Sequence, residues 1–168
     1  MTPVFGITGW KNSGKTTLTE RLVAVFARRG FRVATVKHAH HTFDIDKPGT
    51  DSFRHRAAGA VETAVVSGRR WALMHELRDE EEPRLPDILA RLTPGDLVLV
   101  EGFKGEPHPK IECRKLDARD LTPLAPLVPG IVAIAADHPV DENLPLFQLD
   151  DIEAIADFIA RHVGLRDA

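Results

Sequence analysis

The stretch GWKNSGKTT, residues 9–17, has the residue types and spacing that hold a phosphate chain. Four residues match the pattern G-x-x-x-x-G-K-[ST], the P-loop or Walker A motif: Gly9, Gly14, Lys15 and Thr16. Glycines let the backbone curl so that several N–H groups face one anion, and a following helix adds its unpaired N–H donors. The lysine reaches the outer phosphates, and the threonine hydroxyl is a hard oxygen ligand for Mg²⁺. The stretch therefore predicts a nucleotide site with a magnesium ion.

The segments on both sides of this loop support the prediction. The short apolar run Val4–Thr8 before it indicates a strand, and residues 15–29 after it have the periodicity of an amphipathic helix. The apolar face of that helix is formed by Leu18, Leu22, Val25 and Phe26. A glycine-rich turn that binds nothing is the alternative, and the strand–loop–helix context disfavours it.

A second carboxylate is expected near the phosphate loop to help hold the magnesium ion. The stretch DLVLVEG, residues 96–102, offers Asp96 before an apolar strand and Glu101 after it. Ligands gather at the carboxyl ends of parallel strands, so Glu101 lies at the correct edge of the sheet and Asp96 at the wrong one. Because Glu is one methylene longer than the usual Asp, we expect Glu101 to contact the metal through water.

A polar stretch, residues 38–50, follows a second predicted strand, residues 31–37, and begins at the same sheet edge. Its imidazole and carboxylate side chains are His38, His40, His41, Asp44 and Asp46. One interpretation is a zinc or other transition-metal site, and another is a solvated loop. We favour a third, a switch-like loop in which Asp44 or Asp46 helps hold the nucleotide's magnesium ion. The roles of the three histidines stay open, as does that of Trp10, which either stacks on a base or packs at an interface.

The remaining pattern predicts one α/β domain over residues 1–168, with a mostly parallel sheet flanked by helices, as in P-loop NTPases. Further strands are expected at 96–100, 110–116 and 130–136, and further helices at 51–58, where Asp51 is the expected N-cap, at 85–92 and after Asp150 or Asp151. Two strands separated by Gly68-Arg69-Arg70, at 61–67 and 71–75, predict an additional β-hairpin.

Composition excludes several classes of protein. The net charge of −3 gives no general attraction to nucleic acid, and no apolar run is long enough to span a membrane. The one cysteine, Cys113, excludes an internal disulfide and a CxxC metal site. Without a signal peptide at the N-terminus, we expect a cytoplasmic protein.

Three stretches together resemble the MobB family, the adapter proteins of molybdopterin-guanine dinucleotide biosynthesis: GITGWKNSGKTTL, VKHAHHTFDIDKPGTDSFRHRAAGA and DLVLVEGFK. The resemblance covers at least residues 3–105 and continues more weakly to the C-terminus. It implies a GTP-binding P-loop fold with Mg²⁺, weak GTP hydrolysis and a homodimer. It also implies work alongside the nucleotidyltransferase MobA, which joins GMP to molybdopterin.

By position, the resemblance carries over a set of nucleotide-binding residues: Gly9, Lys11, Asn12, Ser13, Gly14, Lys15, Thr16 and Thr17. It carries over Glu101 and Gly102 as the second acidic motif, so that Thr16, Glu101 and Asp44 are the candidate metal-binding residues. The sequence has no N-K-x-D signature for guanine. Asp137 follows a buried strand at the sheet edge and is the candidate to accept from guanine N1–H and N2–H. No glutamine of the Ras type is evident, which fits slow hydrolysis.

Two other functions fit the same motif. A small-molecule kinase would use the arginine-rich helix at 51–59 as a lid over an acceptor. A non-catalytic module would bind nucleotide as a structural ligand and hold a cofactor such as molybdopterin itself.

Overall fold

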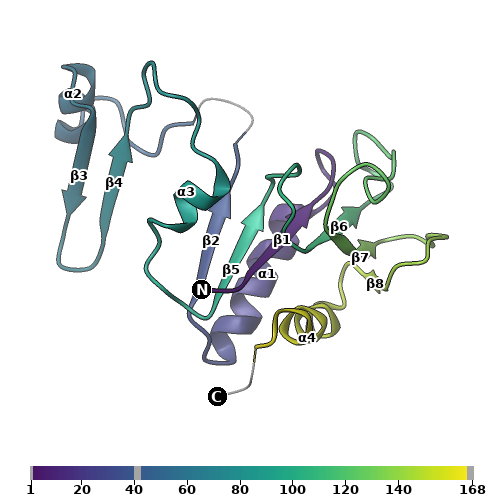
Figure 1. Ribbon diagram of the computed structural model, residues 1–168. Coiled ribbons are helices and arrows are strands. Elements are labelled where there is room, and N and C mark those ends of the chain that lie inside the picture. Colours follow the sequence, from purple (N-terminus) through teal and green to yellow (C-terminus); the bar gives the residue numbers. More distant parts are fainter. Residues whose placement is uncertain (1, 40–42, 166–168) are drawn as a thin grey trace. The chain divides into compact units, whose positions relative to one another are not determined.

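The computed structural model describes residues 2–39 and 43–165 (Figure 1). Contacts divide the chain into two compact units, one of Met1–His38 with Leu89–Ala168 and one of Ala39–Ile88. A single domain over residues 1–168 stays a prediction. None of the helices within the described residues is long and apolar enough to cross a membrane, and the cytoplasmic location also stays a prediction.

The larger unit is built on a six-stranded parallel sheet with the strand order β2-β5-β1-β6-β7-β8. Its strands are β1 (Val4–Thr8), β2 (Val33–Lys37), β5 (Leu97–Glu101), β6 (Lys110–Arg114), β7 (Ile131–Ala136) and β8 (Leu146–Gln148). The predicted parallel sheet is thus confirmed. The sequence did not indicate β8, a strand of three residues of which only the middle one is partly buried.

Two helices, α1 (Lys15–Arg28) and α4 (Ile152–Val163), pack against each other and against β1, on one face of the sheet (Figure 1). The predicted apolar face of α1 is confirmed, since all four of its residues are buried. The core between these helices and the sheet also contains Phe5, Ile7, Ile111 and Ile155. Helix α4 begins after Asp151, whose carboxylate accepts a hydrogen bond from Ala154 N at 3.4 Å.

Strand β6 has apolar side chains on one face and charged side chains on the other. Ile111 and Cys113 belong to the core with α1 and α4. Because side chains alternate along a strand, Lys110, Glu112 and Arg114 point to the other face. Lys110 and Glu112 are nonetheless 0% and 1% exposed. Buried charges need hydrogen-bond partners, and here the loops that cover this face supply them.

Lys110 fastens the loop between β5 and β6. Its ammonium donates to the main-chain oxygens of Glu106 at 2.5 Å and Pro129 at 2.8 Å. Burial lowers the pKa of Lys110 to about 8. The His108 ring lies against Gly6, where a Cβ atom would be 2.6 Å from Nε2. Neither ring nitrogen has a hydrogen-bond partner among the described residues. Burial, with the charge of Lys110, lowers the pKa of His108 to about 4, so the imidazole is neutral at pH 7.

Glu112 fastens the loop between β6 and β7. Arg114 donates to both carboxylate oxygens, at 2.9 and 2.8 Å, and the main-chain N–H groups of Leu124 and Ala125 donate at 2.9 and 3.0 Å. Arg114 also pairs with Glu142 at 2.7 Å. Each carboxylate oxygen of Glu112 thus accepts two hydrogen bonds, which offset the cost of burying its charge.

The smaller unit contains α2 (Asp51–Ala57) and the antiparallel hairpin of β3 (Glu62–Val66) and β4 (Trp71–His75), as the sequence predicts. A third helix, α3 (Leu85–Leu89), is shorter than expected and crosses the boundary between the units. The prediction that Asp51 caps α2 is wrong. The N-cap is Thr50, which has extended backbone and accepts a hydrogen bond from Phe53 N at 3.3 Å.

We predict that Glu112→Ala lowers the free energy of unfolding by about 3–5 kcal/mol, because it leaves the N–H groups of Leu124 and Ala125 without their acceptor and removes one of the two carboxylate partners of Arg114. Urea denaturation followed by circular dichroism measures this. The control is Glu20→Ala on the exposed side of α1, for which we expect a change within about 0.5 kcal/mol. A loss at Glu112 no larger than that of the control would contradict this account of the loop.

Candidate functional site

The phosphate loop joins β1 to α1 and is curled by residues with positive φ. Gly9 has φ of 146°, and a Cβ atom there would lie 2.3 Å from Ser13 Oγ and 2.6 Å from the main-chain oxygen of Cys113. Only glycine fits at this position. Asn12 and Gly14 have φ of 67° and 91°. Gly14 is the N-cap of α1, so the loop leads directly into the unpaired N–H groups of that helix.

Lys15 and Trp10 contact each other within the loop. Lys15 Nζ donates to the main-chain oxygen of Trp10 at 2.6 Å. Burial is the main cause that lowers the pKa of Lys15. The indole N–H of Trp10 donates to the main-chain oxygen of Thr122 at 2.7 Å, which ties the phosphate loop to the loop after β6. Ser13 Oγ is buried without a hydrogen-bond partner among the described residues, an unused polar group in the same loop.

The structure brings together two of the three candidate metal-binding residues. Thr16 Oγ1 donates to Glu101 Oε1 at 3.0 Å, and Lys37 Nζ lies 3.5 Å from the same oxygen. Glu101 is 8% exposed at the end of β5. Asp96, before the same strand, accepts from Arg32 N at 2.6 Å, the role of a turn residue.

The spacing of Thr16 and Glu101 fits a magnesium ion. Both offer hard oxygen atoms, which Mg²⁺ prefers. Two neighbouring ligands of an octahedral Mg²⁺ ion, each about 2.0–2.1 Å from it, lie roughly 2.9 Å apart. The distance of 3.0 Å between Oγ1 and Oε1 is close to that value. The pair can therefore serve as direct ligands or hold the water molecules around the ion.

The histidines of the polar stretch do not form a metal site within the part of the chain that the structure describes. The His38 ring stacks on Phe103, with 4.7 Å between ring centroids and 29° between ring planes. This close approach requires Gly102, where a Cβ atom would lie 2.8 Å from His38 Cβ. His40 and His41 lie outside the described residues, so the zinc interpretation stays open only for them.

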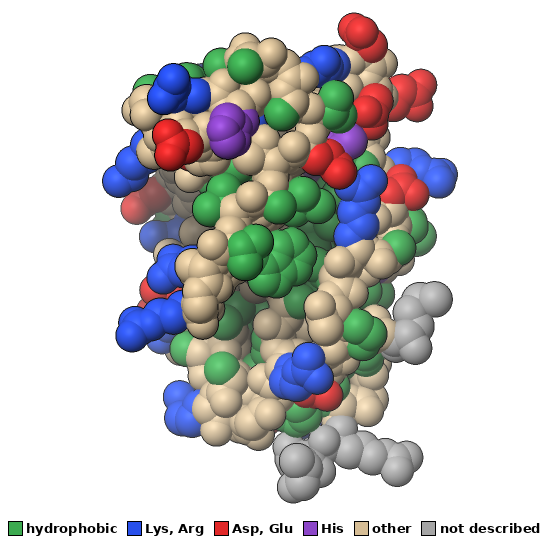
Figure 2. Space-filling model, turned by 90° about the vertical axis from the view of Figure 1, so that its left-hand side faces the viewer, with side chains coloured by type: hydrophobic (Ala, Val, Ile, Leu, Met, Phe, Trp, Pro, Cys, Tyr) green, Lys and Arg blue, Asp and Glu red, His purple; other side chains and the backbone are tan. Residues whose placement is uncertain are grey.

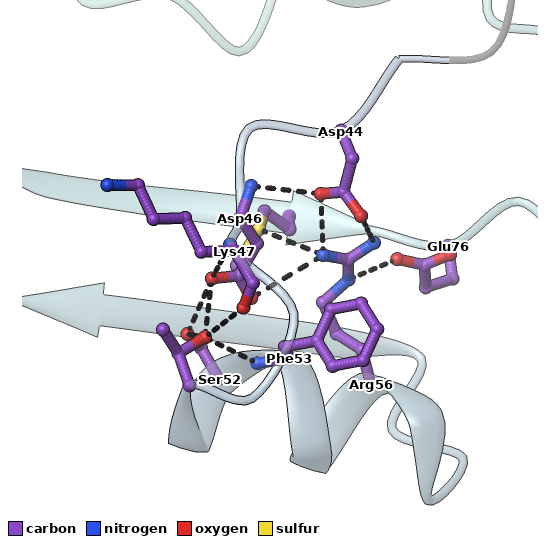
Figure 3. A network of polar contacts seen from close by, with 9 residues as sticks. Asp44, Asp46, Lys47, Ser52, Phe53, Arg56 and Glu76 are labelled. Carbon is purple, nitrogen blue, oxygen red and sulfur yellow. Dashed lines mark hydrogen bonds and ion pairs between the residues drawn. The ribbon is translucent and has the colours of Figure 1, made fainter.

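Asp44, the third metal candidate, belongs to the smaller unit and is held by Arg56 (Figure 3). Arg56 Nη1 and Nη2 donate to its two carboxylate oxygens at 2.9 and 3.3 Å. Asp46 and Glu76 contact the same guanidinium, at 3.5 and 2.6 Å. The hydrogen bond from Arg56 is the main cause that lowers the pKa of Asp44. A metal ion would have to displace this arginine, and the assignment of Asp44 stays a prediction.

Asp137 follows the end of β7, at the edge of the sheet that carries the phosphate loop. Its Oδ1 atom accepts from Leu116 N at 3.1 Å and lies 2.8 Å from His138 Nδ1. The contact with His138 is the main cause that lowers the pKa of Asp137. Lys115 and Leu149 line the same side of the loop, since a Cβ atom at Gly14 would meet their side chains at 3.5 and 3.9 Å.

A small pocket lies beside the phosphate loop and was not predicted. Its lining includes Trp10 and Ser13 from the phosphate loop and Glu112, Lys115 and Thr122 from β6 and the loop that follows it. Lys11 and Asn12 are exposed in the loop and Thr17 is exposed in the first turn of α1, and the nucleotide-binding role of these three residues stays a prediction. Sequence spacing gave no signal for Thr122 or Lys115, because tertiary contacts and not a local motif bring them to the loop.

The chain is similar to known proteins over most of its length. The sequence profile described as "Molybdopterin guanine dinucleotide synthesis protein B", MobB, matches residues 4–137. The chain is 40% identical over 161 residues to the "Molybdopterin-guanine dinucleotide biosynthesis adapter protein" of Escherichia coli K12, and this covers 95% of the chain and 92% of that protein. Its identity to the Haemophilus influenzae protein of the same name is 41%, covering 94% and 87%.

Solved structures of similar proteins have the same fold. The MobB homologue from Bacillus stearothermophilus superposes with a TM-score of 0.72 at 33% identity, covering 97% of this chain and 99% of that one. Bacillus subtilis MobB superposes with a TM-score of 0.76 at 26% identity, covering 98% and 99%.

We predict that Glu101→Gln raises the Mg²⁺ concentration needed for nucleoside triphosphate binding by about tenfold, because it removes the charge beside Thr16 while keeping the side-chain shape. Calorimetric titrations at several Mg²⁺ concentrations measure this. Asp96→Asn, at the other end of β5, is the matched control and should leave the dependence unchanged. Equal Mg²⁺ dependence in both variants would exclude Glu101 from the metal site.

Proposed function

The chain belongs to the MobB family, and on that premise we propose that it is a GTP-binding adapter protein that assists the attachment of GMP to molybdopterin. The similar proteins from Escherichia coli and Haemophilus influenzae are both named as adapters of molybdopterin-guanine dinucleotide biosynthesis. The chain matches 92% of the length of the first and 87% of the second, so the resemblance extends well beyond the phosphate loop.

The observation that carries the proposal is the contact of Thr16 with Glu101, beside a lysine that lies in a loop of positive-φ residues. The loop N–H groups and the N-terminus of α1 would hold the phosphates, with Lys15 on the outer ones. Thr16 and Glu101 would hold Mg²⁺, which neutralises charge on the phosphates when bound. Without a Ras-type glutamine to orient a water molecule, GTP hydrolysis by this site would be slow.

Guanine recognition is assigned to Asp137. In the sheet order, β7 lies on the side of β1 away from β5, so the base and the magnesium ion would occupy opposite sides of the phosphate loop. The main-chain N–H of Leu116 orients the carboxylate through Oδ1, and Oδ2 is the oxygen that we assign to the guanine edge.

As an adapter, the protein would act together with a nucleotidyltransferase of the MobA type, which joins GMP to molybdopterin. Molybdopterin itself is a candidate ligand of the joint complex. The alternative function, a small-molecule kinase, requires α2 to act as a lid over the nucleotide. Helix α2 belongs to the smaller unit and the phosphate loop to the larger one, so no contact within a unit supports this alternative.

A homodimer is part of the proposal, and the hairpin supports it. On one face of the hairpin, Val66 and Trp71 are 75% and 69% exposed, and Leu73 lies beside them. Figure 2 shows hydrophobic side chains gathered on the surface that faces the viewer. Monomeric proteins seldom expose such a patch without a partner.

The charges at the two ends of this hairpin favour a second copy as that partner. The turn carries Arg69 and Arg70, both exposed. At the other end, the carboxylates of Glu62 and Glu80 lie 3.0 Å from the two ring nitrogens of His75. A twofold axis through the apolar face would set the basic end of one copy against the acidic end of the other.

We predict that the protein binds GTP at least about tenfold more tightly than ATP in the presence of Mg²⁺, because a carboxylate paired with guanine N–H groups is left unpaired by adenine. Isothermal titration calorimetry with both nucleotides measures this. Asp137→Asn should remove the preference without removing binding. Lys15→Ala should weaken binding of both nucleotides, whereas Arg161→Ala on the exposed side of α4 should not. Equal affinity for ATP would count against guanine recognition, and rapid phosphoryl transfer to an acceptor would favour a kinase.

We predict that Trp71→Glu converts a dimer to a monomer, because it places a charge in the apolar face between the two copies. Sedimentation velocity measures the oligomeric state, and circular dichroism checks the fold. Leu127→Glu changes another exposed apolar residue, 67% exposed in the larger unit, and should leave the dimer intact. A Trp71→Glu variant that stays dimeric would exclude this interface.

A further inference from the structure

A second lysine, Lys104, lies over a residue near the start of the phosphate loop. Its Nζ atom is 4.0 Å from the centroid of the Trp10 ring, the distance of a cation–π contact. The main-chain oxygen of the same Trp10 accepts the hydrogen bond from Lys15. One residue of the loop therefore holds two ammonium groups, one on its ring and one on its carbonyl.

The bend that carries Lys104 to this position has an uncommon backbone conformation. Gly102 and Phe103 have φ of 96° and 47°, and the second value is unusual for a bulky residue. A hydrogen bond from Gly102 N to a carbonyl of β1 at 3.2 Å and the stacking of Phe103 on His38 hold the bend. Strain of this kind persists only where surrounding contacts impose it, and it is frequent at ligand sites.

The lysines at this edge of the sheet form a concentration of positive charge. Lys37 and Lys15 lie near Glu101, a single carboxylate that already pairs with Lys37. Burial, followed by the charge of Lys15, lowers the pKa of Lys104, and nearby carboxylates offset only a part of this. Burial and the neighbouring positive charges destabilise the charged forms of these lysines. An anion bound between them would stabilise those charged forms.

The sheet order indicates which part of a nucleotide Lys104 would meet. Lys104 follows β5, on the same side of β1 as Glu101 and the proposed magnesium ion. Asp137, the proposed guanine reader, follows β7 on the other side. A nucleotide lying along the phosphate loop would thus have its base near Asp137 and its terminal phosphate near Lys104.

We infer that Lys104 is a second phosphate-binding lysine, which leaves the ring of Trp10 for the terminal phosphate when a triphosphate binds. In the structure, Trp10 holds both ammonium groups. The exchange is favourable because an ammonium–phosphate contact is a charge-assisted hydrogen bond, which is stronger than a partly exposed cation–π contact. The role of Lys104 rests on the proposed nucleotide binding but not on the identity of the base.

The test compares Lys104→Met with the wild type by calorimetric titration of GTP, GDP and inorganic tripolyphosphate in the presence of Mg²⁺. We expect GTP and tripolyphosphate to bind about tenfold more weakly and the affinity for GDP to change less than about twofold, since GDP lacks the third phosphate that Lys104 would contact. Lys104→Arg keeps the charge and should retain most of the affinity. Arg161→Met removes a positive charge elsewhere and should change none of the three affinities.

Unchanged binding of GTP and tripolyphosphate in Lys104→Met would overturn the inference, and so would an equal loss for GDP. A wild-type protein that binds tripolyphosphate through Lys104, but prefers GTP no more than ATP, would support the inference while contradicting guanine recognition. A wild-type protein that binds neither GTP nor tripolyphosphate would overturn both the inference and the proposed function.

Discussion

The hydrogen-bonded register of β1 with its two parallel neighbours is the constraint on which the site depends. Ile7 pairs with Glu101 of β5, and Thr8 pairs with Glu112 of β6. These pairings bring one carboxylate beside the start of α1 and another beneath the neighbouring loops. A slip of one residue would turn each side chain to the opposite face of the sheet. The contact of Glu101 with Thr16 is therefore a product of strand pairing as much as of the phosphate motif.

Strand β6 shows how one face of this sheet is covered without a long helix. Its apolar residues face α1 and α4, and its charged residues face loops. A buried charge is costly in an apolar layer, but loops have main-chain N–H and C=O groups that are not used in secondary structure. Lys110 donates hydrogen bonds to main-chain carbonyl groups, and Glu112 accepts hydrogen bonds from main-chain N–H groups. The two kinds of group satisfy each other, and the loops around the phosphate site are held in place.

The parts of the structure that the sequence predicted are those with a local signal. The P-loop motif predicted the phosphate loop, and the helical periodicity of the apolar residues predicted α1. The position of Glu101 at the carboxyl end of a predicted strand placed it near that loop. Strand β8 has too few buried residues to produce a pattern. The sequence suggested that Asp44 or Asp46 helps hold a magnesium ion, but it gave no sign that Arg56, twelve residues after Asp44, binds the Asp44 carboxylate. The contacts of Lys104 and Thr122 with Trp10 depend on long loops whose paths no local sequence pattern determines.

Several anchors of the loops beside the phosphate site bind main-chain atoms. Lys110, Glu112 and Trp10 bind carbonyl or N–H groups of these loops, not their side chains. Every residue except proline offers the same two groups, so these main-chain anchors tolerate most amino-acid replacements at the loop positions that they bind. Evolution can therefore vary the surface presented to a partner or a second substrate while the anchors stay in the sheet and the phosphate loop. The residues that hold the loops in place are thus different from the loop residues that would contact a partner or a second substrate.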